Sequence, residues 1–200
     1  MRTVTSTISD VINMTWPMVF VSMVIIISIR VCYLIKKHEH VVLYKELIML
    51  SMIIYVLMLF QVVTGQDVVN WSSNNFIPFK EIFRYKIGSR LFFKNVLGNL
   101  IMFVPFGLFT SYTLKNDYNA KLIVFLTVLA SLSIECVQLT IGRVFDVDDI
   151  ILNTIGGYFG YYLYKGICHF KNRAPSFCGK EWFLNIVSIL ILLCIVAVVW

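Results

Sequence analysis

The chain alternates between long apolar stretches and shorter polar stretches that are rich in lysine and arginine. Each apolar stretch is close to the roughly 20 residues that an α-helix needs to cross a bilayer. They cover residues 17–35, 46–63, 95–114, 122–141, 149–164 and 182–200. The pattern predicts an all-α, polytopic membrane bundle of about six transmembrane helices. The composition agrees, because 59% of the residues are hydrophobic and only 14% are charged, unlike a soluble domain.

The polar segment 64–94 separates the second and third apolar stretches. Pro78 interrupts any helix there, and beyond it aromatic residues alternate in groups with basic ones. The basic residues are Lys80, Arg84, Lys86, Arg90 and Lys94. This pattern predicts an amphipathic segment that lies in the lipid head-group region. A plain basic connector is the alternative.

Two of the apolar stretches carry polar residues on one helical face. At roughly 100° of rotation per residue, a sector of about 80° on stretch 122–141 contains Thr127, Ser131, Glu135 and Gln138. A sector of about 60° on the next stretch contains Asp149, Asn153, Gly156 and Gly160. A carboxylate in hydrocarbon costs roughly 3 kcal/mol, so these faces should turn toward protein or a wet cavity. With the charged turn between them, they form a candidate site.

Charge and cysteine content narrow the partners. The net charge of +6 fits loops beside anionic lipid head groups, so membrane lipids are expected as partners and nucleic acid is not. The five cysteines lack the spacing of metal ligands, and we expect reduced thiols. The chain also lacks a glycine-rich phosphate loop and a haem motif. We therefore expect no cofactor and no structural metal.

Lysine and arginine favour the cytoplasmic loops of membrane proteins. They gather after the first, third and fifth stretches, which predicts that these loops are cytoplasmic and both termini are outside. The N-terminus shows no pattern of a removable signal peptide. The cations of segment 64–94 then lie outside, against the rule, and we expect them to be retained there for a function. A reversed topology is the alternative.

Four motifs resemble those of the VanZ family of bacterial membrane proteins, which is named for a component of glycopeptide (teicoplanin) resistance. They are NFIPF at 75–79, NVLGNLIMFVPFG at 95–107, SIECVQ at 133–138 and GRVFDVDDIILNTIGGYFGY at 142–161. The resemblance implies a multi-pass protein of the bacterial cell membrane that contributes to resistance to lipoglycopeptides. The resemblance covers a VanZ-like domain at 47–164. The hydrophobic pattern adds two parts outside it: residues 1–46 with an extra span and cytoplasmic loop, and residues 165–200 with a basic cytoplasmic loop and an extra span. The resemblance brings no agreed catalytic mechanism.

Three hypotheses for the polar residues remain open. In the first, an outward-facing site binds an anionic lipid, a polyprenyl-linked precursor or the antibiotic, with cations holding phosphate or carboxylate. Its binding residues are Lys80, Arg84, Asn99, Glu135, Gln138, Arg143, Asp146, Asp149 and Asn153.

In the second hypothesis, the protein is an enzyme that modifies a lipid-linked or peptidoglycan precursor. Its catalytic candidates are Glu135, which would act as acid or base, and Asp148 and Asp149, which could surround Mg²⁺. In the third, the network is structural. Glu135 would pair with Arg143 or with the asparagines, and Arg143 could instead pair with Asp146. Asp148 or Asp149 would cap the following helix.

Overall fold

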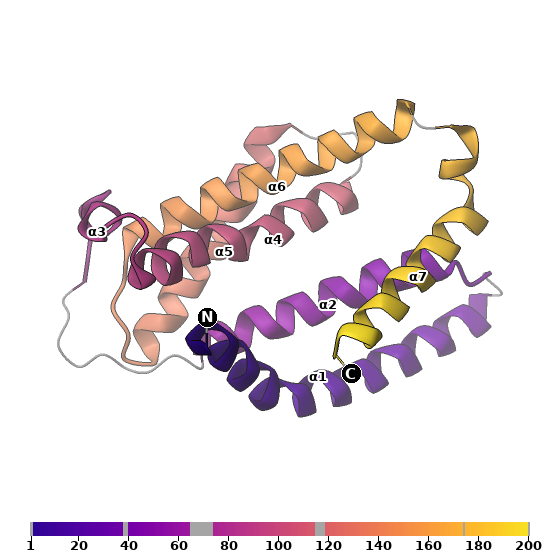
Figure 1. The fold of residues 1–200 in the computed structure, drawn as a ribbon, viewed down its shortest axis with the longest axis horizontal. Coiled ribbons are helices and arrows are strands. Elements are labelled where there is room, and N and C mark those ends of the chain that lie inside the picture. Colours follow the sequence, from indigo (N-terminus) through magenta and orange to yellow (C-terminus); the bar gives the residue numbers. More distant parts are fainter. Residues whose placement is uncertain (1, 38–39, 65–73, 115–118, 174, 200) are drawn as a thin grey trace. The chain divides into compact units, whose positions relative to one another are not determined.

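In this computed structural model, the described residues are 2–37, 40–64, 74–114, 119–173 and 175–199. The chain forms two compact units. The terminal unit contains Met1–Val62 and Phe170–Trp200, and the central unit contains Val63–His169. Figure 1 follows the helices of both units along the chain by colour.

The terminal unit consists of long α-helices and a short 3-10 helix, and polar contacts join the α-helices. Its helices are α1 (Arg2–Lys37), α2 (Leu43–Thr64), the 3-10 helix η2 (Ser176–Gly179) and α7 (Glu181–Val199). Arg30 of α1 binds both carboxylate oxygens of Glu46 on α2, each at 2.8 Å. At the start of α2, the Tyr44 N–H donates to Asn185 Oδ1 of α7 at 3.0 Å.

The central unit holds every residue of the candidate site. Its elements are α3 (Lys80–Arg84), the π-helix η1 (Phe92–Leu97), α4 (Gly98–Leu114), α5 (Ala120–Thr140) and α6 (Val147–Arg173). The π-helix runs directly into α4. In Figure 1, α4, α5 and α6 form the layered body of this unit, and α3 lies near the end where α5 turns into α6.

Glycines bring α4 and α6 into backbone contact. A Cβ atom added at Gly107 of α4 would overlap the carbonyl of Gly157 on α6. Cβ atoms at Gly156 and Gly160 would overlap the carbonyls of α4 residues in the same way. Small residues permit such close approach of helices in membranes. This packing brings the polar residues of α6 up against α4 and α5.

The all-α membrane bundle expected from the hydrophobic pattern is confirmed. Three described helices are long and apolar enough to cross a membrane: Leu43–Thr64, Phe92–Leu114 and Ala120–Thr140. Their outward side chains are apolar and exposed, as Phe125 (61%) and Leu129 (51%) of α5 show. The six-span count and the outside placement of both termini stay predictions.

Several predicted boundaries are wrong. The stretch expected at 149–164 continues as a helix to Arg173, so Lys165 and His169 belong to α6 rather than to a loop. Likewise, α1 begins at Arg2, well before residue 17, and includes Pro17. Hydropathy misplaced these ends because it marks where an apolar run stops, whereas a helix can continue through polar residues. Of the predicted interfacial segment 64–94, residues 65–73 lie outside the described part of the chain.

Candidate functional site

The polar face of α5 is buried against protein. Thr127 and Ser131 have no exposed surface, Glu135 is 1% exposed and Gln138 is 6% exposed. Asn153 of α6 is 2% exposed, and its Nδ2 donates to Ser131 Oγ at 2.9 Å. The helical periodicity therefore placed these residues correctly, and the amide of Asn153 joins the two faces.

Glu135 is held by the turn that follows its own helix. The Asp146 N–H donates to Glu135 Oε2 at 2.9 Å. With its amide oriented to satisfy both neighbours, Gln138 donates to Glu135 Oε1 at 3.0 Å and accepts from Arg143 Nη1 at 2.5 Å. Arg143 therefore reaches the acid through an amide. This arrangement differs from the direct pairing with Glu135 or Asp146 that we considered from the sequence.

Asp146 caps α6. Its Oδ1 accepts from the Asp148 N–H at 2.9 Å, which is the geometry of an N-cap residue at the helix that begins at Val147. The same oxygen accepts from Asn75 Nδ2 at 2.8 Å. Burial raises the pKa of the Asp146 carboxyl above its usual value, and the hydrogen bond from Asn75 opposes this shift. The prediction that Asp148 or Asp149 caps this helix is therefore wrong by two or three residues.

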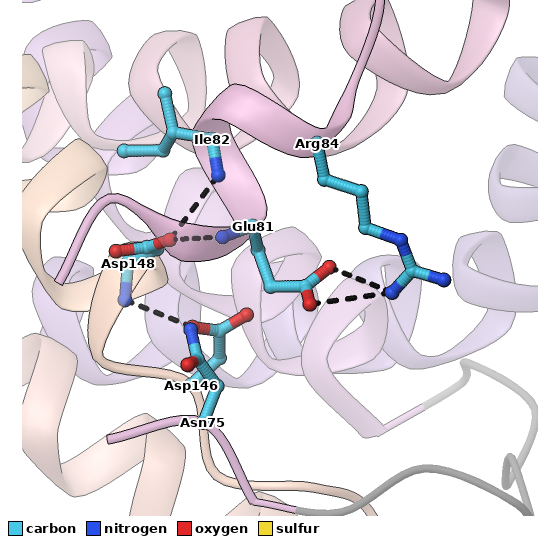
Figure 2. Close-up of polar contacts among 6 residues, drawn as sticks. All are labelled: Asn75, Glu81, Ile82, Arg84, Asp146 and Asp148. Atoms are coloured by element: carbon cyan, nitrogen blue, oxygen red, sulfur yellow. Dashed lines mark hydrogen bonds and ion pairs between the residues drawn. The ribbon is translucent and has the colours of Figure 1, made fainter. Parts of the chain in front are cut away.

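Asp148 instead caps α3, which precedes it by more than sixty residues in the chain. Its carboxylate is 1% exposed and accepts backbone N–H groups of Phe79 at 2.5 Å, Glu81 at 2.7 Å and Ile82 at 3.1 Å. Figure 2 shows this carboxylate beneath the first turn of α3. Phe79 has a φ of 67°, a left-handed conformation that a bulky residue rarely adopts. Asp148 therefore holds α3 in place.

A short backbone bridge fixes the chain just before α3. The Asn75 N–H donates to Phe145 O at 2.8 Å, and the Val147 N–H donates to Asn75 O at 3.1 Å. The rings of Phe76 and Phe145 stack with centroids 5.4 Å apart. Sequence reasoning assigned no role to Asn75. The signal available was a pair of asparagines, residues 74 and 75, directly before an apolar turn with proline.

Helix α4 contributes Asn99 to the site. The Asn99 Nδ2 donates to Asp149 Oδ1 on α6. Asp149 also interacts electrostatically with Glu135, Asp146 and Arg143. Side chains from α4, α5, α6 and the turn between the last two therefore meet in one polar network within an apolar bundle.

Two predicted cations do not contact this network through their side chains. Lys80 and Arg84 lie on α3 with exposed side chains. The Arg84 guanidinium pairs with Glu81 at 3.1 Å, and Figure 2 shows it turned away from Asp146 and Asp148. Five residues of α3 make little more than one turn, so its basic side chains point outward while its backbone contacts the site.

The three aspartates at the start of α6 have protein partners. Asp146 accepts a hydrogen bond from Asn75, Asp148 from the α3 backbone, and Asp149 from Asn99. Within the described ranges, no group of three or more His, Cys, Asp or Glu side chains is arranged to hold a metal ion.

Comparison with known proteins identifies the family of the chain. The sequence of residues 47–169 matches the VanZ/LLP1 protein family. The chain belongs to the VanZ/LLP1 family. It is also 38% identical over 74 residues to Protein VanZ of Enterococcus faecium, a match that covers 36% of this chain and 45% of that protein. The chain thus aligns with less than half of that VanZ protein. No solved structure matches the chain significantly.

Proposed function

We propose that the chain contributes to resistance to lipoglycopeptide antibiotics such as teicoplanin through a binding site on the outer face of the bacterial membrane. The ligand is an envelope lipid, a lipid-linked precursor or the antibiotic itself. The VanZ/LLP1 family match supports the link to glycopeptide resistance. The partial likeness to Protein VanZ of Enterococcus faecium supports it further. Binding would reduce access of the antibiotic to its target, or alter the lipid around it.

The observation that carries the proposal is the chain of contacts from Arg143 through Gln138 to Glu135. Arg143 is partly exposed where the turn leaves α5, whereas Glu135 is buried, so the contacts run from the end of the bundle into it. A guanidinium binds phosphate or carboxylate by paired charge-assisted hydrogen bonds. The exposed cations of α3 would add attraction to an anionic head group, rather than direct contacts.

The proposal is tested by susceptibility to teicoplanin and vancomycin in a susceptible host. Wild type, Glu135→Gln and Arg143→Ala are compared at matched protein abundance, with Glu181→Gln as a control. Glu181 is exposed and lies in the terminal unit. We expect both site variants to lose the teicoplanin resistance that wild type and the control provide. Full resistance in Glu135→Gln and Arg143→Ala would refute the role of this site.

A second candidate function is an enzyme that modifies a lipid-linked or peptidoglycan precursor. The observation in its favour is that Glu135 and Asp149 interact electrostatically while each has its own hydrogen-bond donors. Two acids in distinct surroundings can divide the roles of acid and base. Its test is turnover of a lipid-linked precursor by the purified chain, lost in Glu135→Gln and absent from the host membrane alone. Turnover equal in Glu135→Gln and wild type would count against it.

A further inference from the structure

In the buried layer where α5 meets α6, one side-chain acceptor has no donor among the described residues. Asn153 is 2% exposed and uses its Nδ2 on Ser131, but its Oδ1 has no donor among the described residues. A buried amide oxygen almost always has a donor in a folded protein, so an orphan one requires an explanation. This oxygen is therefore available to a donor from outside the chain.

Asp149 adds to the same deficit. It lies one helical turn before Asn153 on the same face of α6, and such neighbours are about 5–6 Å apart at Cβ. Its side chain accepts one hydrogen bond from the described part of the chain, from Asn99. A carboxylate offers about four acceptor positions. Two neighbouring groups on α6 therefore present acceptors that the protein fills only in part.

The facing helix, α5, also carries a neutral polar residue and an acid one turn apart. Ser131 and Glu135 lie one turn apart on α5, opposite Asn153 and Asp149, and the Glu135 charge acts on Asp149. Two acids at this depth are costly without a compensating positive group. Arg143 acts on both acids at longer range, while its guanidinium contacts the Gln138 amide. A compact cation with several N–H donors would supply both a donor for the unpaired oxygen and a positive charge beside the acids.

We propose that this layer binds the primary ammonium group of an envelope molecule, with Asp149 and Asn153 as the recognising residues and Glu135 beside them. An ammonium carries three donors and no acceptor, which matches what these groups lack. Arg143 is then placed for a phosphate on the same molecule, as in an ethanolamine phosphate head group. The inference rests on the proposed function and specifies the chemistry of its ligand.

Two sources can supply this chemistry: an aminolipid head group and a water-soluble amine. The test uses the full chain in nanodiscs of phosphatidylglycerol that contain either phosphatidylethanolamine or phosphatidylcholine, with lipid retention measured by native mass spectrometry. The two zwitterionic lipids differ in the methylation of the ammonium, which removes its N–H donors. Soluble phosphoethanolamine is added as competitor in a second arm, and sodium chloride at equal ionic strength in a third.

We expect wild type to retain phosphatidylethanolamine at least about tenfold more tightly than phosphatidylcholine. Methylation removes the N–H donors, and the loss of one hydrogen bond to a charged group is enough for a difference of this size. Asp149→Asn and Asn153→Leu should lose this preference, and Glu181→Gln should keep it. Strong competition by soluble phosphoethanolamine would assign the ammonium to a water-soluble ligand, and its absence would assign it to a lipid. Equal retention of both lipids without competition by phosphoethanolamine, or displacement by sodium alone, would overturn the inference.

Asn153→Gln guards against loss of folding, because it keeps an amide that can donate to Ser131 Oγ and offer its oxygen, and it adds no charge to the layer. It should retain the preference for phosphatidylethanolamine, and its loss there would contradict the assigned role. The two proposals also fail separately. If retention shows no ammonium preference but Arg143→Ala abolishes resistance, only the ammonium inference fails. If the preference is present but Glu135→Gln and Arg143→Ala keep full resistance, the proposed function fails.

Discussion

Asp148→Ala should release α3 from the bundle while leaving α6 intact. The side chain caps α3 through three backbone N–H groups, of Phe79, Glu81 and Ile82. Its own N–H, which is unaffected by the substitution, still donates to the cap residue Asp146. The change therefore separates the docking of α3 from the start of α6.

The magnitude follows from the three contacts. Loss of a helix cap costs about 1 kcal/mol, and hydrogen bonds to a charged group contribute about 1.5–3 kcal/mol each. Water solvates the freed N–H groups once α3 moves away, so the loss is well below the sum. Relief of the left-handed backbone at Phe79 returns about 1 kcal/mol. We expect a net loss of about 2–3 kcal/mol for the docking of α3.

Hydrogen–deuterium exchange of the chain in nanodiscs measures this loss directly, because local opening sets the exchange rate of the α3 amides. At 1.4 kcal/mol per tenfold, Phe79, Glu81 and Ile82 should exchange about 30- to 150-fold faster in Asp148→Ala. Asp149→Asn is the matched control, because Asp149 contacts Asn99 rather than α3. Unchanged protection of these amides in Asp148→Ala, or equal loss in the control, would refute the capping account.

Three further predictions concern packing, strain and pH. Gly107→Ala places a Cβ on the carbonyl of Gly157 and should destabilise the fold by about 3 kcal/mol in thermal unfolding. Gly166→Ala, which meets nothing within 4 Å, should be neutral or stabilise by up to about 1 kcal/mol, and equal effects would contradict the packing. Phe79→Gly should slow exchange of the α3 amides by relieving the positive φ, and faster exchange would show that the ring itself holds α3. Because the pKa of Asp146 is raised in the folded state, the folded protein keeps this proton at a pH where the unfolded chain has lost it. The contribution of Asp146 to the free energy of unfolding therefore falls as pH rises from 3.8 through the higher pKa of the folded state. Asp146→Asn keeps the cap acceptor and should flatten this part of the stability–pH curve; an unchanged slope would assign it to another group.

The helical faces could be predicted from the sequence because their cause is local. A carboxylate within an apolar run must turn toward protein, and one helical period then places Thr127, Ser131 and Gln138 beside Glu135. The partners of these residues could not be predicted in the same way. The contact between Asp148 and the α3 backbone joins positions more than sixty residues apart, and hydropathy carries no information about such pairing.

The cations of α3 show a second limit. Lys80 and Arg84 were expected in the site because they are basic and share a segment with aromatic residues. Their charge could be read from the sequence, but the direction of their side chains depends on which face of a five-residue helix is docked. Asp148 docks the backbone end of that helix, so the side chains extend away from it. The sequence indicated the segment, and the structure shows that its backbone makes the contacts with Asp148; a role of Lys80 and Arg84 in ligand binding stays a prediction.

The central claim is that this network operates from the outer face of the membrane. It is tested most directly by labelling single cysteines in intact cells with a membrane-impermeant maleimide, in a chain whose five native cysteines are replaced by serine or alanine. Lys86→Cys follows α3, and Ser176→Cys lies in the terminal unit between α6 and α7; both side chains are exposed. The account predicts that Lys86→Cys is labelled in intact cells and Ser176→Cys only after the membrane is opened. Labelling of Ser176→Cys in intact cells, with Lys86→Cys protected, would contradict it.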